Sequence, residues 1–213
     1  CTLTYAENMT DTKRLYKDFQ QFNQRFQYYC KQHGYGKPEY IVMMEPQGRG
    51  AWHAHLLYIW QDMNAPFIPN QEFADLWGHG FVRIKKLDNV DNVGAYLTAY
   101  LGDMELSEID WTKWNEITKG ATVKQVEMLD ENGQKVTKQV LKGARLNLYP
   151  ANFNMLRCSR GIKRPTEEMM SQEEANKKVL AATKTFESAI KLNDPENEFE
   201  TIIIKEQYNK IRK

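Results

Sequence analysis

Two histidines, His53 and His55, flank Ala54 at the start of the apolar run AWHAHLLYIW, and Glu45 stands eight residues before the first of them. Side chains alternate along a β-strand, so both imidazoles would leave the same face of a sheet. Two aligned imidazoles supply half of a typical four-ligand metal site. A purely structural role is the alternative, because a histidine in a strand is more often hydrogen-bonded than metal-bound. The pattern therefore predicts a metal site only if further ligands lie nearby.

Glu45 is the best candidate for the next ligand. It ends the predicted strand EYIVMME, residues 39–45, and the turn PQGRG leads into the predicted partner strand, residues 51–60. Two imidazoles and one carboxylate leave coordination positions open, which suits a catalytic ion better than a closed structural one. The mixed ligands admit Mg²⁺, Mn²⁺ or Zn²⁺. Such an ion polarises a phosphoryl oxygen or generates a metal hydroxide.

A pair of tyrosines follows in GAYLTAYLGD. Tyr96 and Tyr100 are four residues apart in a predicted helix, residues 88–103, so both phenols project from one helix face. Taken alone, they read equally well as core tyrosines of an amphipathic helix. A phenol with an ordinary pKa of about 10 is a poor nucleophile until it is deprotonated or set beside a cation. A metal ion near these phenols would polarise the phosphate under attack, so the combination favours a tyrosine nucleophile.

The elements that must position these residues follow the order β-α-β-β-α-β-α. Apolar spacing, caps and turns predict strands at 2–5, 39–45, 51–60 and 81–87, and helices at 13–33, 70–77 and 88–103. This order matches a ferredoxin-like split unit of the α+β class. We expect a central antiparallel sheet with helices packed on it.

The second half of the chain predicts further elements and a boundary. A helix should start at Ser107, and residues 122–128 and 134–141 should form a hairpin around the turn LDENG. The acidic helix-like segment 166–180 follows Pro165, and residues 185–192 and 199–208 should form a second strand pair. We therefore expect a catalytic domain at residues 1–165 and a C-terminal appendage at residues 166–213, made of a helix and a β-hairpin.

Composition excludes several classes of protein. The 213 residues carry 41% hydrophobic side chains and a net charge of +1, without an apolar stretch of about 18 residues or a secretory signal. We expect a cytoplasmic protein that does not contact a membrane. Three widely spaced cysteines argue against both a disulfide framework and a cysteine-based zinc site. The phosphate-binding motif GxxxxGK[ST] is absent from the sequence, so we expect no nucleotide cofactor.

Basic residues gather locally on this nearly neutral chain. They occur in the turn after the first central strand, in FVRIKKL and in LRCSRGIKR, where they are suited to phosphate contacts. Solvated strand ends are the alternative interpretation. The candidate DNA-binding residues are Arg49, Arg83, Lys85, Lys86, Arg157, Arg160 and Lys163.

Together these segments resemble a known family. TLTY, HAHLLY and AYLTAYL resemble, in order and spacing, the three motifs of rolling-circle replication initiators of the HUH endonuclease superfamily. The segments EPQGRGAWHAH and CSRGIKRP are similar to initiators from bacterial plasmids, phages and integrated elements. The resemblance spans residues 1–165. Relaxases place their tyrosine before the metal motif, so the order found here favours the initiator class.

The resemblance implies a metal-dependent tyrosine DNA endonuclease and strand transferase. Such an enzyme nicks and rejoins single-stranded DNA at a specific site through a covalent 5′-phosphotyrosyl intermediate. The divalent ion, Mg²⁺ or Mn²⁺ ahead of Zn²⁺, would be held by His53, His55 and Glu45. Tyr100 would attack first and Tyr96 second. The partners implied are single-stranded or hairpin origin DNA and the host helicase and polymerase.

One departure from the family concerns a lysine that many relatives carry three residues after the tyrosine. Ala99 and Asp103 stand at those positions here. Lys85 or Lys86 could replace the charge, a metal-facing Asp103 could substitute for it, or this branch dispenses with it.

Two other functions stay open. One is a two-tyrosine transposase of the same superfamily, which the context of the DNA target would distinguish. The other is a ferredoxin-like nucleic-acid-binding module without cleavage, in which the histidines are structural and the tyrosines stack on bases.

Overall fold

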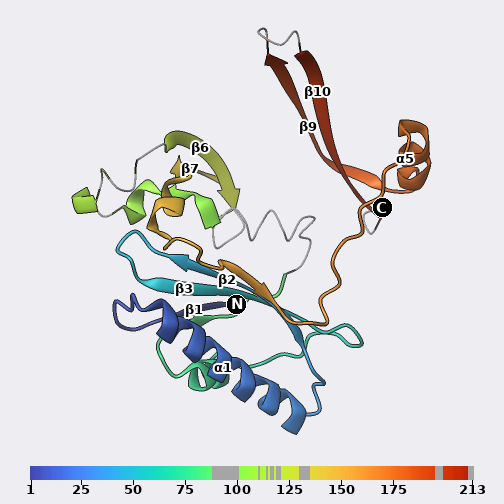
Figure 1. The fold of residues 1–213 in the computed structure, drawn as a ribbon. Coiled ribbons are helices and arrows are strands. Elements are labelled where there is room, and N and C mark those ends of the chain that lie inside the picture. The colour runs from blue at the N-terminus through green and yellow to red at the C-terminus, as the bar shows by residue number, and fades with distance from the viewer. Residues whose placement is uncertain are drawn as a thin grey trace. The chain divides into compact units, whose positions relative to one another are not determined.

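The computed structural model describes residues 1–87, 101–109, 111–113, 115, 118, 121–129, 135–194 and 199–210. The chain divides into two compact units, of which the first ends at Lys163 and the second begins at Arg164. The expected α+β class is confirmed, because helices accompany antiparallel sheets (Figure 1).

A five-stranded antiparallel sheet forms the centre of the first unit. Its strands lie in the order β4 (Val82–Arg83), β1 (Thr2–Thr4), β3 (Trp52–Ile59), β2 (Glu39–Pro46) and β8 (Leu156–Cys158). With α1 (Thr12–Gln32) and α2 (Asn70–Trp77), the first four strands follow the β-α-β-β-α-β order of a ferredoxin-like split unit, and β3 lies between β1 and β2.

Helix α1 forms because a cap and a helical apolar spacing coincide. The Asp11 side chain accepts hydrogen bonds from the backbone N–H groups of Lys13 and Arg14 at the first turn. Apolar residues then recur every three or four positions and are buried: Leu15, Phe19, Phe22, Phe26 and Cys30. They pack with Phe73 and Trp77 of α2 against one face of the sheet.

The sheet face under these helices is apolar. Val42 and Met44 of β2 lie opposite Leu56 and Ala54 of β3, and all four side chains are buried in the core with Leu3 of β1. Because alternate side chains point to opposite faces, the residues between them project from the face away from the helices.

A second, three-stranded sheet belongs to the same unit, in the order β5 (Met104–Glu105), β7 (Lys135–Lys142) and β6 (Thr122–Leu129). The predicted β6–β7 hairpin is confirmed. With the 3₁₀ helices η1 (Leu106–Glu108) and η3 (Ala144–Leu148), the sheet builds a small core of Met104, Ile109, Leu141 and Ala144.

Three expectations for the first unit change. The helix predicted from Ser107 is wrong: the chain forms only η1 and a second 3₁₀ turn, η2 (Trp111–Lys113), because Ile109 between them is extended and buried in the small core. The strand predicted at 81–87 shortens to β4. Most of the helix predicted at 88–103 lies outside the described residues, where only 101–102 are seen to be helical.

The second unit contains a helix and a hairpin. Helix α5 (Gln172–Val179) begins at a capping box in which Ser171 and Glu174 bond reciprocally, so the helix is shorter than the predicted 166–180. Strands β9 (Thr183–Asp194) and β10 (Phe199–Asn209) pair antiparallel, which confirms the predicted strand pair. Across the described ranges of the chain, no helix is both long enough and apolar enough to cross a bilayer.

Candidate functional site

Strand pairing brings the predicted metal ligands together on the sheet face away from α1 and α2. Glu45 of β2 and Thr4 of β1 lie on either side of His53. In the neighbouring row, Thr2 and Met43 lie on either side of His55. The sheet thus places both imidazoles and the carboxylate on one face, as the alternation of β3 predicts.

His55 is held by partners at both ring nitrogens. Its Nε2 lies 2.8 Å from Oε1 of Glu45, and its Nδ1 lies 3.3 Å from the hydroxyl oxygen of Thr2. Glu45 is only 5% exposed, so this contact also serves a buried carboxylate. The two contacts fix the orientation of the ring relative to β1 and β2.

His53 stays neutral at physiological pH. Burial lowers the pKa of His53 to about 4; the charge of Glu45 opposes this shift, while the positive charges of His55, Arg49 and Arg145 favour it. The neutral imidazole carries the free nitrogen lone pair that metal ions bind.

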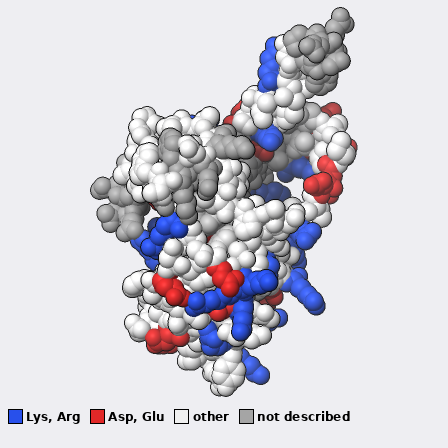
Figure 2. All heavy atoms as spheres, turned by 60° about the vertical axis from the view of Figure 1, so that its left-hand side comes forward, with Lys and Arg blue, Asp and Glu red and all other residues white. Residues whose placement is uncertain are grey.

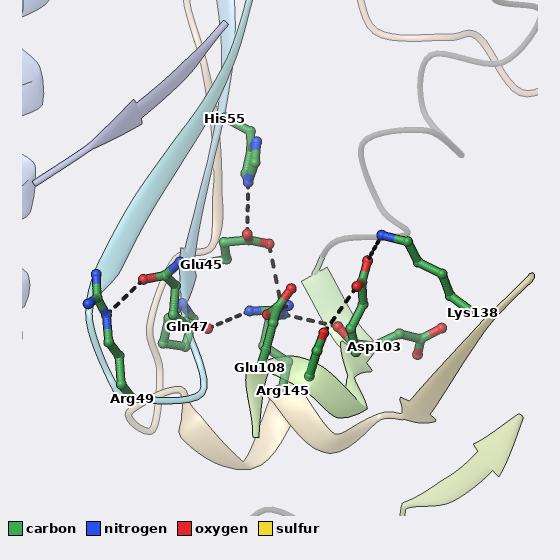
Figure 3. A network of polar contacts seen from close by, with 11 residues as sticks. Glu45, Gln47, Arg49, His55, Asp103, Glu108, Lys138 and Arg145 are labelled. Carbon is green, nitrogen blue, oxygen red and sulfur yellow. Dashed lines mark hydrogen bonds and ion pairs between the residues drawn. The ribbon is translucent and has the colours of Figure 1, made fainter. Parts of the chain in front are cut away.

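A buried arginine, Arg145 of η3, reaches the end of β2 (Figure 3). Its guanidinium donates hydrogen bonds to the carbonyl oxygens of Pro46 at 2.7 Å and Asp103 at 3.1 Å, and to the Glu108 carboxylate at 2.9 Å. Its Nε also lies 3.9 Å from Oε2 of Glu45. Arg145 therefore ties the strand carrying Glu45 to the segment that follows the tyrosine motif.

The β2–β3 turn packs directly against that same segment. A Cβ atom placed on Gly48 would lie 1.8 Å from the carbonyl oxygen of Glu108, so only glycine fits this approach. The Asp103 carboxylate accepts a hydrogen bond from the backbone N–H of Gly143 at 3.1 Å. Asp103 is thus engaged with the turn that precedes η3, which does not match the metal-facing role considered for it.

The donor atoms suit a divalent ion, but the site is closed by its own contacts. Oε2 of Glu45 is buried and accepts no hydrogen bond from the described residues, and neutral His53 adds a nitrogen donor. In the part of the chain that can be described, however, no group of three or more His, Cys, Asp or Glu side chains has a geometry that could hold a metal ion. A cation here would compete with His55 and Arg145 for the Glu45 carboxylate.

The two predicted nucleophiles, Tyr96 and Tyr100, lie outside the described residues. Their proximity to the imidazoles therefore stays a prediction. The described chain resumes at Leu101, and Asp103, three residues beyond Tyr100, is the residue whose carbonyl oxygen Arg145 binds.

Three of the predicted DNA contacts lie at or beside the edge strand β4. Arg83 pairs with Thr2, so it shares the sheet face of His55, and its side chain is exposed. Lys85 and Lys86 follow the strand and are exposed.

The other predicted DNA contacts are more scattered. Arg157 of β8 pairs with Val42, which places it on the helix-covered face, where its guanidinium lies 3.6 Å from the centre of the Tyr16 ring. Arg160 and Lys163 are exposed after β8. Arg49 lies in the β2–β3 turn, where its Nε donates to Gln47 at 3.1 Å.

Charges of both signs cover the protein. On the face that Figure 2 shows, Lys and Arg side chains lie beside Asp and Glu side chains. Nucleic-acid binding would therefore rely on a few local cations, as the net charge of +1 already indicates.

Sequence reasoning missed Arg145 and Gly48, although both shape this site. Arg145 was visible only as a lone cation in the segment ARLNL, and Gly48 only as one of two glycines in a turn. Neither pattern indicates a partner, because the contacts join segments that are far apart in the chain.

Comparison with known proteins gives one match. Residues 1–105 match the model of the ORF2-type family of replication-associated proteins. The match supports a replication initiator protein. It includes Glu45, both histidines and both tyrosines. Searches of curated proteins and of solved structures gave no significant match.

Proposed function

We propose that this protein initiates rolling-circle replication by nicking and rejoining single-stranded DNA through a covalent 5′-phosphotyrosyl bond. The observation that carries the proposal is the gathering of Glu45, His53 and His55 on one face of a ferredoxin-like sheet. The family match over residues 1–105 supports a role in replication initiation and includes the two tyrosines.

Glu45, His53 and His55 would hold the divalent ion, Mg²⁺ or Mn²⁺ ahead of Zn²⁺. When bound, the ion supplies Lewis-acid polarisation of a phosphoryl oxygen. The chain's own residues prepare the site: Thr2 and Glu45 orient the His55 ring, and burial keeps His53 neutral.

In the reaction, the Tyr100 phenol loses its proton and its oxygen attacks the scissile phosphorus. The bond from phosphorus to the 3′ oxygen breaks, and that oxygen leaves as a 3′-hydroxyl after taking up a proton. One phosphodiester is exchanged for another, so closure needs no nucleotide cofactor. Tyr96 makes the second attack at termination, which rejoins the strand.

The substrate is single-stranded or hairpin origin DNA in the cytoplasm. Arg83, Lys85 and Lys86 lie at the edge of the sheet where a strand crossing the imidazole face would leave it. The host polymerase extends the 3′-hydroxyl, and a host helicase opens the duplex.

The decisive test is capture of the covalent adduct. The full chain is incubated with a random single-stranded DNA pool, labelled at the 3′ end, in Mn²⁺, and adducts are separated on a denaturing gel. We expect an adduct that EDTA abolishes and that the Tyr96→Phe, Tyr100→Phe double variant lacks. Tyr28→Phe is the matched control, because this tyrosine of α1 is 65% exposed and should leave the adduct unchanged.

DNA binding without any adduct would support the non-cleaving module instead. Sequencing of the trapped DNA separates the remaining alternatives. Fragments from a replication origin support the initiator, and fragments from the ends of a mobile element support the transposase.

A further inference from the structure

Phe81 is an exposed aromatic residue beside the imidazole face. Its side chain is 77% exposed, and its carbonyl oxygen accepts a hydrogen bond from the backbone N–H of Thr4 at 2.9 Å. The next residue, Val82, packs against the core under the helices. Because side chains alternate, Phe81 and Arg83 project from the opposite face, which also carries His53.

The pairing of strands places Phe81 and Arg83 in register with the site. Phe81 extends the row of Thr4, His53 and Glu45, and Arg83 extends the row of Thr2 and His55. Both residues lie two strands away from β3, a distance of about 10 Å. One nucleotide therefore has room between this edge and the imidazoles.

The chemistry at this edge fits an unpaired nucleic-acid strand. An exposed phenylalanine alone has no special meaning. Here its neighbours are three cations, Arg83, Lys85 and Lys86, of which two are separated from it by one or three residues along the chain. An aromatic ring beside cations is the arrangement that stacks a base and holds the adjoining phosphate. A duplex keeps its bases stacked on each other, so the ring selects a single strand.

We propose that Phe81 is a stacking platform for one unpaired base of single-stranded DNA, whose backbone runs past Arg83 onto the imidazole face. The stacked base fixes where the next phosphate lies relative to His53 and His55. This inference rests on the proposed function for its substrate class, but it concerns binding and needs no cleavage step.

The test measures binding in the Tyr96→Phe, Tyr100→Phe background, so that covalent capture plays no part. The probe is a fluorescein-labelled random single-stranded DNA pool, followed by fluorescence anisotropy. We expect Phe81→Ala to raise the dissociation constant about 5- to 100-fold, the range expected from loss of one stacked base. Phe81→Trp should restore binding, because a larger aromatic face stacks at least as well.

Phe67→Ala is the matched control, since this phenylalanine lies outside the strands and is 86% exposed. We expect its affinity to equal that of the parent. The thermal midpoint should be unchanged in all three variants, because neither side chain is buried. A labelled duplex pool should bind the Phe81→Ala variant and the parent equally.

Equal single-strand affinity of parent and Phe81→Ala would overturn the platform, as would an equal loss in Phe67→Ala. The proposed nicking fails by a different result, namely absence of a tyrosine-dependent adduct in the unmodified chain. The two outcomes are read in separate experiments and cannot be confused.

Discussion

His55 Nε2 lies 2.8 Å from Glu45 Oε1, so the carboxylate and the imidazole predicted to share a metal ion are in direct contact. The same contact would form in a purely structural pair. What distinguishes the site is the other carboxylate oxygen, which is buried, accepts no hydrogen bond from the described residues and lies 3.9 Å from the Nε of Arg145.

Glu45→Gln keeps the shape of this side chain and removes its charge. Under the proposed function, adduct formation in Mn²⁺ should fall at least about 100-fold, because even the outer partners of metal ligands contribute about 10- to 100-fold. Glu39→Gln is the control on the same strand and sheet face, about 20 Å away, and should keep full activity. Full activity of Glu45→Gln would remove Glu45 from the ligand set.

Arg145→Met should destabilise the first unit by about 3–5 kcal/mol, because three acceptors and the nearby Glu45 charge lose a buried cation. Urea unfolding measures the change. In Lys138→Met, loss of the 2.7 Å pair with Glu105 should change stability by less than about 1 kcal/mol, since the Lys138 side chain is 40% exposed. A similar loss in both variants would argue against a special role for Arg145.

Gly48→Ala should lower the free energy of unfolding by roughly 1–3 kcal/mol, because the added methyl overlaps the backbone of Glu108. Gly102→Ala is the matched control: nothing lies within 4 Å of its added Cβ, so stability should stay the same or rise slightly. Thermal melting of the two variants side by side checks the difference. If Gly48→Ala melts with the parent, the β2–β3 turn does not pack as the structure shows.

The cysteines report the fold chemically. Burial raises the pKa of the Cys30 thiol to about 11, whereas Cys158 of β8 is exposed. Iodoacetamide at pH 8 should therefore modify Cys158 and leave Cys30 intact until the protein unfolds, because the thiolate is the reactive form. Peptide mass spectrometry measures both sites. Equal labelling in the native state would contradict the packing of α1.

Local patterns were enough to predict the ferredoxin-like part. Alternation in AWHAHLLYIW placed Ala54 in the core and His53 on the other face, as the register shows. Helix α2 runs from Asn70 to Trp77 as predicted and ends at Gly78, whose φ of +71° is the left-handed conformation that glycine favours.

Contacts between distant segments could not be predicted by the same rules. Ile109 interrupts the helix predicted from Ser107, because it joins a core whose other members include Leu141. Strand β8 pairs with β2, more than a hundred residues earlier, and its short sequence LRC carries no strand pattern of its own. Arg145 likewise donates to Pro46, and 99 positions separate the two along the chain.

Strand β3 alternates between two tasks along its length. Trp52, Ala54 and Leu56 are buried beneath the helices, while His53 and His55 occupy the positions between them. Sliding this strand by a single residue would drive both imidazoles into the oily interior and turn a tryptophan out to water. Correct folding and correct placement of the imidazoles are therefore inseparable, since a chain that misaligns them also fails to fold.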